Sequence, residues 1–177
     1  MAGSTICGFL ACQNYTTQKG AVAKAVATET KPFFKLSLAQ WSFHRALQEN
    51  NMDHLQFAAK AKSLGFHGIE YVNQFLKDKV EDASYLEQMN KEADQNKIKQ
   101  LLIMVDGEGG LANLDKAERA EAVTNHIKWI NAAKIIGCHS IRVNCFGEGE
   151  SSAVSEAGID GLSRLSEIAA LYYLAML

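Results

Sequence analysis

The chain has 177 residues, enough for one domain with a substantial hydrophobic core but too few for two ordinary domains. Its 47% hydrophobic and 21% charged residues exclude a disordered chain, a collagen-like fibre and a coiled-coil rod. With 18 Lys and Arg against 20 Asp and Glu, the formal charge is −2, so we expect no nucleic-acid partner. The longest uncharged apolar stretch, residues 168–177, is too short to cross a bilayer, so no transmembrane span is expected. The four cysteines lack the CxxC spacing of a structural zinc site.

Residues 1–32 show no apolar periodicity and end at Pro32, so they are interpreted as a leader or linker. Within them, Leu-Ala-Cys at 10–12 resembles the end of a bacterial lipoprotein signal, in which Cys12 would be lipidated after cleavage. That interpretation implies a periplasmic or lipid-anchored protein. No Lys or Arg precedes Lys19, however, and the apolar run is shorter than a working signal core. The alternative is a frayed N-terminus of a cytoplasmic protein.

From Phe33 onward, short strand-like runs alternate with longer stretches of helical spacing, which predicts four βα units and a parallel sheet. The predicted strands are residues 34–41, 67–72, 99–105 and 140–146. The predicted helices begin near Asp53, span 81–95, span 115–136, and run from near Ile159 to the end of the chain.

An internal repeat supports this organisation. Residues 61–70 (AKSLGFHGIE) recur 72 residues later as 133–142 (AKIIGCHSIR), so the same junction of helix end, glycine and strand start is used in every second unit. Because side chains alternate along a strand, Ile69 and Ile141 are expected to face the helices. Glu70 and Arg142 are then expected on the other face of the sheet.

The predicted fold class is therefore α/β: a parallel (β/α) barrel of the TIM type, present as an incomplete half barrel with about four βα units. In this interpretation residues 33–177 form the N-terminal half of a barrel, strands one and four are open edges, and the chain ends within its fourth helix. The alternative is a complete small doubly wound α/β domain with four parallel strands.

Three segments carry a resemblance to a known family: SLAQWSFHRAL at 37–47, SLGFHGIEYV at 63–72 and IGCHSIRVNCFG at 136–147, with a glycine-rich stop after the third strand. They resemble the N-terminal half of the sugar phosphate isomerase/epimerase family, the xylose isomerase-like TIM barrels, over about residues 33–170. The resemblance implies metal-assisted proton transfer next to a sugar carbonyl, with two carboxylates and one divalent cation (Mn, Mg, Co or Zn). In that family the metal ligands come from the fifth strand onward, so we expect no metal ligand, no cofactor and no turnover in this chain alone.

Five residues near the carboxyl ends of the predicted strands are candidates for binding a sugar, because barrel enzymes build their sites there. Trp41 and His44 are placed to stack on a sugar and to hydrogen-bond it; alternatively, Trp41 caps the core and His44 is a surface residue. Glu70 is an inward carboxylate, and the alternative for it is a structural ion pair with Arg142.

The two remaining candidates follow strands three and four. Asp106 lies with Glu108 in the glycine-rich loop and is placed to orient a hydroxylated ligand, although such charged loops are commonly just solvated. Asn144 is expected to face the lumen, where its amide meets a substrate hydroxyl. The loop lacks the GxGxxG pattern, which disfavours a nucleotide site.

Two functions remain open. The first is a sugar isomerase or epimerase that acts on a small-molecule sugar, of which this chain would be an inactive half. The second is a noncatalytic sugar-binding or partner-binding α/β module, self-associating through its open sheet edges or covered by another chain. An apurinic endonuclease on the related barrel is disfavoured by the net charge and by the absence of lumen-facing histidines after strands two and four.

Overall fold

The structure is a computed structural model that describes residues 33–172 and 174–177. The interpretation of residues 1–32 as a leader, including the lipidation of Cys12, lies outside these residues. No helix in the described part of the chain is long and apolar enough to span a membrane.

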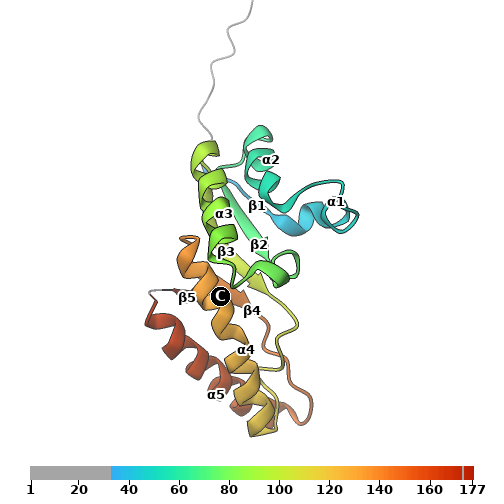
Figure 1. Cartoon of the computed structure of the whole chain (residues 1–177). Helices are drawn as coiled ribbons and strands as arrows, with labels where there is room; N and C mark the ends of the chain where they lie inside the picture. The colour runs from blue at the N-terminus through green and yellow to red at the C-terminus, as the bar shows by residue number, and fades with distance from the viewer. Residues whose placement is uncertain (1–32, 173) are drawn as a thin grey trace, which may run out of the picture. The chain divides into compact units, whose positions relative to one another are not determined.

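Five parallel strands form one sheet in the order β1-β2-β3-β4-β5 (Figure 1). The strands are β1 (Ser37–Ala39), β2 (Gly68–Val72), β3 (Lys99–Val105), β4 (Ser140–Val143) and β5 (Ala175–Met176). Each strand hydrogen-bonds to the one before it in the sequence, so the order never reverses. Because parallel crossovers are right-handed, an unreversed order places the connecting helices on one face of the sheet.

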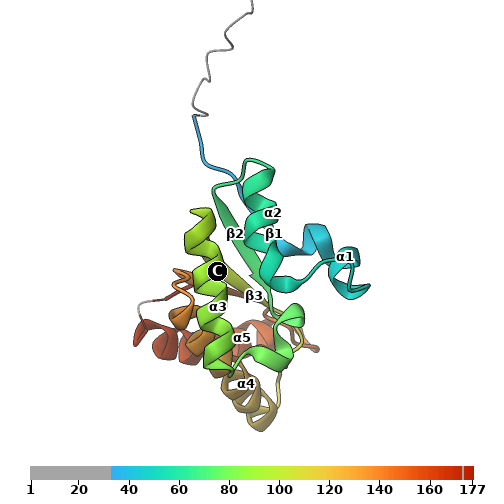
Figure 2. The same ribbon diagram turned by 45° about the horizontal axis from the view of Figure 1, so that its top comes forward.

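The helices are α1 (His44–Gln48), α2 (Phe57–Ser63), α3 (Ala83–Asn96), α4 (Lys116–Ile135) and α5 (Ser151–Ala170). Four short 3-10 turns lie in the connections: η1 (Gln40–Phe43), η2 (His54–Gln56), η3 (Asn73–Phe75) and η4 (Lys77–Lys79). Figures 1 and 2 show α3, α4 and α5 on the same side of the sheet. This single winding is the arrangement of a TIM-barrel-like fold and corrects the doubly wound alternative, which needs a reversal of strand order.

Three of the helices begin directly after an acidic residue whose side chain caps them. Asp82, Asp115 and Glu150 each accept hydrogen bonds from two backbone N–H groups in the first turn of α3, α4 and α5. Hydrogen bonds that favour the ionised form hold the pKa of each carboxyl group below its usual range: the largest contribution comes from the Ser84 hydroxyl for Asp82, from the Ser152 hydroxyl for Glu150 and from the backbone N–H groups for Asp115.

The end of the chain differs from the sequence-based expectation. Helix α5 begins at Ser151, not near Ile159, because Glu150 caps it there, and it ends at Ala170. The apolar tail then forms β5, which pairs with β4, so the sheet has five strands and its second edge is β5. The outer strands predicted at 34–41 and 140–146 are also shorter, with only Ser37–Ala39 and Ser140–Val143 in the sheet.

The hydrophobic core lies between the sheet and the helices. Ile69, Ile103 and Ile141 are fully buried on the helix-covered face, as the repeat predicts for Ile69 and Ile141. They pack with Phe57 of α2 and Trp129 of α4, among other buried side chains. The opposite face, here called the lumen face, carries the alternate residues of each strand, including Glu70 and Arg142.

The long connection from β3 to α4 is anchored by Glu108, which is only 9% exposed. Its carboxylate accepts hydrogen bonds of 2.9 Å from the indole N–H of Trp129 and from the Lys128 ammonium. The expectation of a merely solvated loop is therefore wrong for Glu108: this side chain fixes the loop to the helix that follows it.

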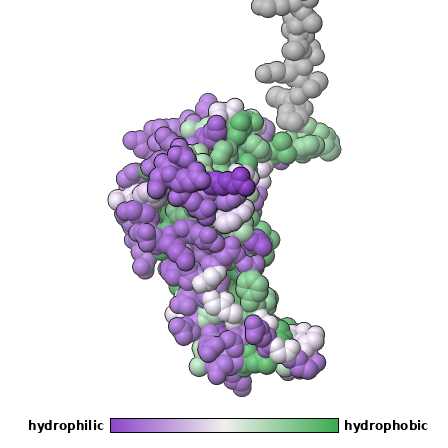
Figure 3. Space-filling view, turned by 90° about the vertical axis from the view of Figure 1, so that its right-hand side faces the viewer, coloured by the Kyte–Doolittle hydropathy of each residue, from purple (hydrophilic) through white to green (hydrophobic). Residues whose placement is uncertain are grey.

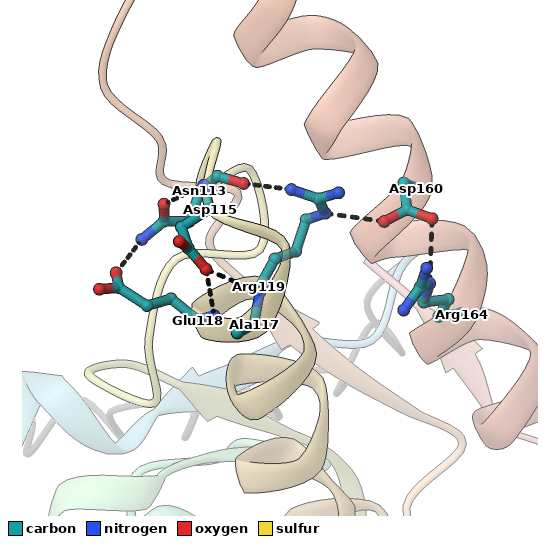
Figure 4. A network of polar contacts seen from close by, with 7 residues as sticks. All are labelled: Asn113, Asp115, Ala117, Glu118, Arg119, Asp160 and Arg164. Atoms are coloured by element: carbon teal, nitrogen blue, oxygen red, sulfur yellow. Dashed lines mark hydrogen bonds and ion pairs between the residues drawn. The ribbon is translucent and has the colours of Figure 1, made fainter.

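A second anchor joins the start of α4 to α5 (Figure 4). The buried guanidinium of Arg119 donates to the backbone carbonyl of Asn113 and, at 2.7 Å, to Asp160, which also accepts from Arg164 at 2.9 Å. The hydrogen bond from Arg119 is the main reason that the pKa of Asp160 lies below its usual range.

The surface is mostly hydrophilic in the view of Figure 3, where hydrophobic residues gather beside the start of the described chain. Phe33, Phe34 and Leu36, which lead into β1, are 101%, 61% and 49% exposed. An apolar surface therefore adjoins the outer edge of β1.

His54 of η2 is enclosed between the first loop and two tyrosines. Its Nδ1 lies 3.0 Å from the hydroxyl of Tyr85, its ring lies 5.7 Å from that of Tyr71, and its Nε2 is buried without a partner among the described residues. Burial lowers the pKa of His54 from 6.5 to about 4, against a smaller opposite effect from Asp53. The imidazole is therefore neutral at pH 7.

This burial makes the stability depend on pH. Because the unfolded chain protonates His54 below about pH 6.5 and the folded chain resists until about pH 4, we expect the free energy of unfolding to fall by up to about 3 kcal/mol across this window. Urea denaturation at pH 4 to 8 measures this dependence. In the variant His54→Gln, the free energy of unfolding should decline less steeply as the pH falls. Burial lowers the pKa of His126 too, so its contribution to the decline remains in both proteins. Parallel curves for the two proteins between pH 6.5 and 4 would contradict the assignment.

Candidate functional site

The carboxyl ends of β1 and β2 are joined by Gln40, which directly follows β1 and has no exposed surface. Its side-chain oxygen accepts a 3.0 Å hydrogen bond from the backbone N–H of Val72 at the end of β2. This contact replaces the strand pairing that stops at Ala39 and fixes where the first loop leaves the sheet.

The ends of β2 and β3 are joined in the same manner by Asn73, which is fully buried. Its amide donates to the backbone carbonyl of Asp106 at 2.8 Å and accepts from the backbone N–H of Asp106 at 3.2 Å. Both backbone groups of Asp106 are thus held by one side chain.

Asp106 in turn meets Asn144, the residue after β4, whose amide donates to the Asp106 carboxylate. Arg142 donates to the side-chain oxygen of Asn144 at 3.3 Å. The structure therefore brings together two of the residues predicted to bind a ligand, Asp106 and Asn144, on adjacent strand ends. One oxygen of the Asp106 carboxylate remains available to accept from a ligand.

Trp41 and His44, predicted as a pair, are in contact. Their rings stack with centroids 4.9 Å apart and an interplanar angle of 11°, and Phe75 of η3 lies 6.0 Å from Trp41 (centroid to centroid). Trp41 is 41% exposed, so it does not cap the core. His44 Nδ1 lies 2.8 Å from the backbone carbonyl of Trp41, and because a carbonyl only accepts, Nδ1 carries the proton and Nε2 is an acceptor.

Glu70 lies half-buried on the lumen face, farther from the strand ends, where it accepts a hydrogen bond from the Ser37 hydroxyl of β1. The alternative for Glu70, an ion pair with Arg142, is not found among the described residues. Glu70 aligns with Leu102, whereas Arg142 aligns with Met104, so the two side chains lie two strands apart, or about 10 Å, and at different levels.

The described residues do not fit a divalent cation. Nowhere in residues 33–172 and 174–177 do three His, Cys, Asp or Glu side chains gather closely enough to hold a metal ion. Glu70 and Asp106 are the acidic candidates of the lumen side, but they are hydrogen-bonded to a serine hydroxyl and an asparagine amide.

Sequence reasoning missed Gln40 and Asn73. Both are polar residues that directly follow an apolar strand residue, Ala39 or Val72, which is a signal that the sequence does contain. Their role is to position the loops, since neither side chain has exposed surface through which a ligand could reach it.

Comparison with curated protein sequences finds no match. Solved structures do resemble the fold. They include a D-psicose 3-epimerase with D-tagatose from Clostridium cellulolyticum, at a TM-score of 0.66 and 14% identity over 81% of this chain and 51% of that one. The IolI protein with a bound zinc atom has a TM-score of 0.60 and 17% identity over 81% and 50% of the two chains.

A sugar phosphate isomerase/epimerase from Parabacteroides distasonis gives a TM-score of 0.63 and 12% identity over 87% of this chain and 54% of that one. The chain thus spans about half the length of each structure, and identities this low establish the fold alone. The family model described as xylose isomerase-like TIM barrel matches residues 58–172, more than half of the sequence, so this chain belongs to that family.

Proposed function

We propose that this chain carries a sugar-binding part of a sugar isomerase or epimerase whose reaction is proton transfer next to a sugar carbonyl. The observation that supports the proposal is the presence of two contacting pairs, Trp41 with His44 and Asp106 with Asn144, after the carboxyl ends of strands in a member of this barrel family.

The proposed binding mode begins with stacking. One face of a sugar ring presents C–H groups, which pack on an exposed indole, and Trp41 is held in place for this contact by the stacked ring of His44. Nε2 of His44 then accepts a hydrogen bond from a sugar hydroxyl.

The other polar groups are also mainly acceptors. Glu70 and Asp106 each accept one side-chain hydrogen bond within the described residues, which leaves a second carboxylate oxygen on each for a ligand hydroxyl. Asn144 supplies an amide beside Asp106. A set of acceptors suits the hydroxyl donors of a sugar.

Turnover requires more than these residues. A proton next to a carbonyl leaves readily only when a positive centre stabilises the developing oxyanion and a positioned base takes the proton. The divalent cation supplied for this in the family has no ligand set among the described residues. We therefore propose that this chain alone binds sugar without converting it.

The two tryptophans make the proposal testable by fluorescence, since Trp41 is exposed at the site and Trp129 is fully buried. Titration with D-tagatose should change the emission saturably. Trp41→Phe should abolish this change while keeping the stacking surface. Trp41→Ala should weaken binding about fivefold or more by calorimetry, because the stacking contact of about 1 kcal/mol is lost.

The matched control is Phe146→Ala, which removes another exposed aromatic side chain (63% exposed) without touching the proposed contacts. The affinity should be the same with EDTA and with Mn²⁺, and no sugar should be converted under either condition. Saturable Mn²⁺ binding tighter than about millimolar would contradict the absence of a metal site, and no D-tagatose binding would contradict the proposal itself.

A second candidate is a noncatalytic module that binds sugar or a partner and is covered by a second copy of the chain. The outer edges of β1 and β5 have no neighbouring strand among the described residues, and exposed Phe33, Phe34 and Leu36 adjoin the β1 edge. This apolar edge favours association.

For this candidate we expect a defined dimer with a cooperative thermal transition in size-exclusion chromatography and calorimetry. Phe34→Glu should shift the dimer to monomer by placing a charge on the apolar edge, whereas Ile159→Glu, an equally polar change on the exposed side of α5, should not. A monomer at every concentration, or identical behaviour of the two variants, argues against the module.

A further inference from the structure

A separate pocket lies between the loops that follow β1 and β2. Its volume is about 380 Å³, within the ~300–1,000 Å³ range of small-molecule sites. The residues that matter for its chemistry are Gln48, Asn50, Asp53, His54, Gln74 and Phe75. Both loops leave the carboxyl ends of strands, so the pocket is on the side of the sheet where Trp41 lies.

Three side-chain amides define the chemistry of this pocket. The side chains of Gln48, Asn50 and Gln74 have no hydrogen-bond partner within the described part of the chain. Each amide both donates and accepts, as does a hydroxyl group, so the three can pair with several hydroxyls of one ring.

The backbone of one of these residues has a defined conformation. Asn50 adopts a left-handed conformation with φ 56°, and its N–H bonds to the carbonyl of Leu47 at 3.3 Å. A non-glycine residue in this region has an energetic cost that the surrounding turn must offset, which fixes the exit from α1.

The charge of the pocket excludes anions. Asp53 is its one carboxylate, with one oxygen bonded to the N–H of Leu55. His54 adds no positive charge at pH 7, since burial lowers its pKa to about 4. No Lys or Arg lines the pocket, so a phosphate group would meet a negative charge without compensation.

The pocket adjoins the stacking surface through Phe75. This ring lines the pocket and lies 6.0 Å from Trp41, centroid to centroid. A ring stacked on Trp41 therefore has the pocket next to it, across a single aromatic side chain.

We propose that the pocket lined by Gln48, Asn50 and Gln74 is a second sugar subsite, which takes a neutral hydroxylated ring beside the ring on Trp41. The substrate class is then a glycoside of two or more neutral rings and not a phosphorylated monosaccharide. This extension to a two-ring ligand rests on the proposed sugar binding at Trp41.

Nuclear magnetic resonance of the full chain tests the subsite directly, with methyl β-D-glucopyranoside as the probe. The side-chain amide signals of Gln48, Asn50 and Gln74 should shift saturably. Gln74→Ala should raise the dissociation constant measured from the Gln48 and Asn50 signals about fivefold, because one hydrogen bond to the sugar is lost. The control Gln88→Ala, an exposed glutamine on α3 that does not line this pocket, should change neither signal.

The indole N–H signal of Trp41 reports the first site independently. If it shifts saturably while the three amides do not, the subsite is overturned and the proposed function stands. If Gln74→Ala weakens binding at Trp41 as much as at the amides, the pocket is not a separate subsite. Equal amide shifts with D-glucose 6-phosphate would overturn the preference for a neutral ring, and no shift anywhere would overturn both proposals.

Discussion

The candidate site depends on one interaction, the pair of hydrogen bonds in which the Asn73 amide donates to the backbone carbonyl of Asp106 and accepts from its backbone N–H. At this point β3 has ended, and Asp106 can no longer obtain its hydrogen bonds from the sheet. Buried backbone groups without partners are costly, so a side chain that satisfies both groups fixes the conformation of the chain there. The Asp106 carboxylate is thereby held toward Asn144, and the two strand ends act as one unit.

The loop beyond Asp106 is held against α4 and α5 by buried polar contacts and by close packing. Glu108 bonds to Trp129, and Arg119 bonds to Asn113 and Asp160. Gly161 of α5 allows the helix to touch the same loop, because a Cβ there would lie 2.0 Å from the carbonyl oxygen of Leu111. A charged, glycine-rich sequence thus becomes a rigid connection, and rigidity is what a set of ligand-binding groups needs from its support.

Much of the fold could be predicted from the sequence where local signals and packing agree. Strand β3 spans Lys99–Val105 as expected, and α4 begins directly after its predicted start, Asp115, which caps it. The beginning of α5 was missed because the buried positions in the first half of this helix are the small residues Ala157, Gly158 and Gly161, which give only a weak apolar pattern. Strand β5 has two residues and exists through its pairing with β4, a contact that no local pattern encodes.

Prediction of the candidate site from the sequence has the same limit. The residues proposed to contact a ligand could be selected from the sequence, because polar and aromatic side chains at predicted strand ends form a recognisable pattern. The residues that position them could not be: Gln40 and Asn73 act through backbone groups of neighbouring strands, and that partnership depends on which strands are adjacent. The alternative prediction of an ion pair between Glu70 and Arg142 was wrong for a related reason. The register of the strands, and not the sequence repeat, decides which side chains meet.

The lumen face links the two candidate functions. Beside Glu70 it carries Leu102 and Met104, which are half-buried and apolar. A hydrogen bond from a sugar hydroxyl to a carboxylate is weak in water and stronger where water is excluded, since the effective dielectric constant falls. A second copy or further strands placed over this face would remove water from Glu70 and Asp106 as well. Covering the sheet and binding a sugar are therefore expected to reinforce each other, because both rely on the same displacement of water from one polar and apolar surface.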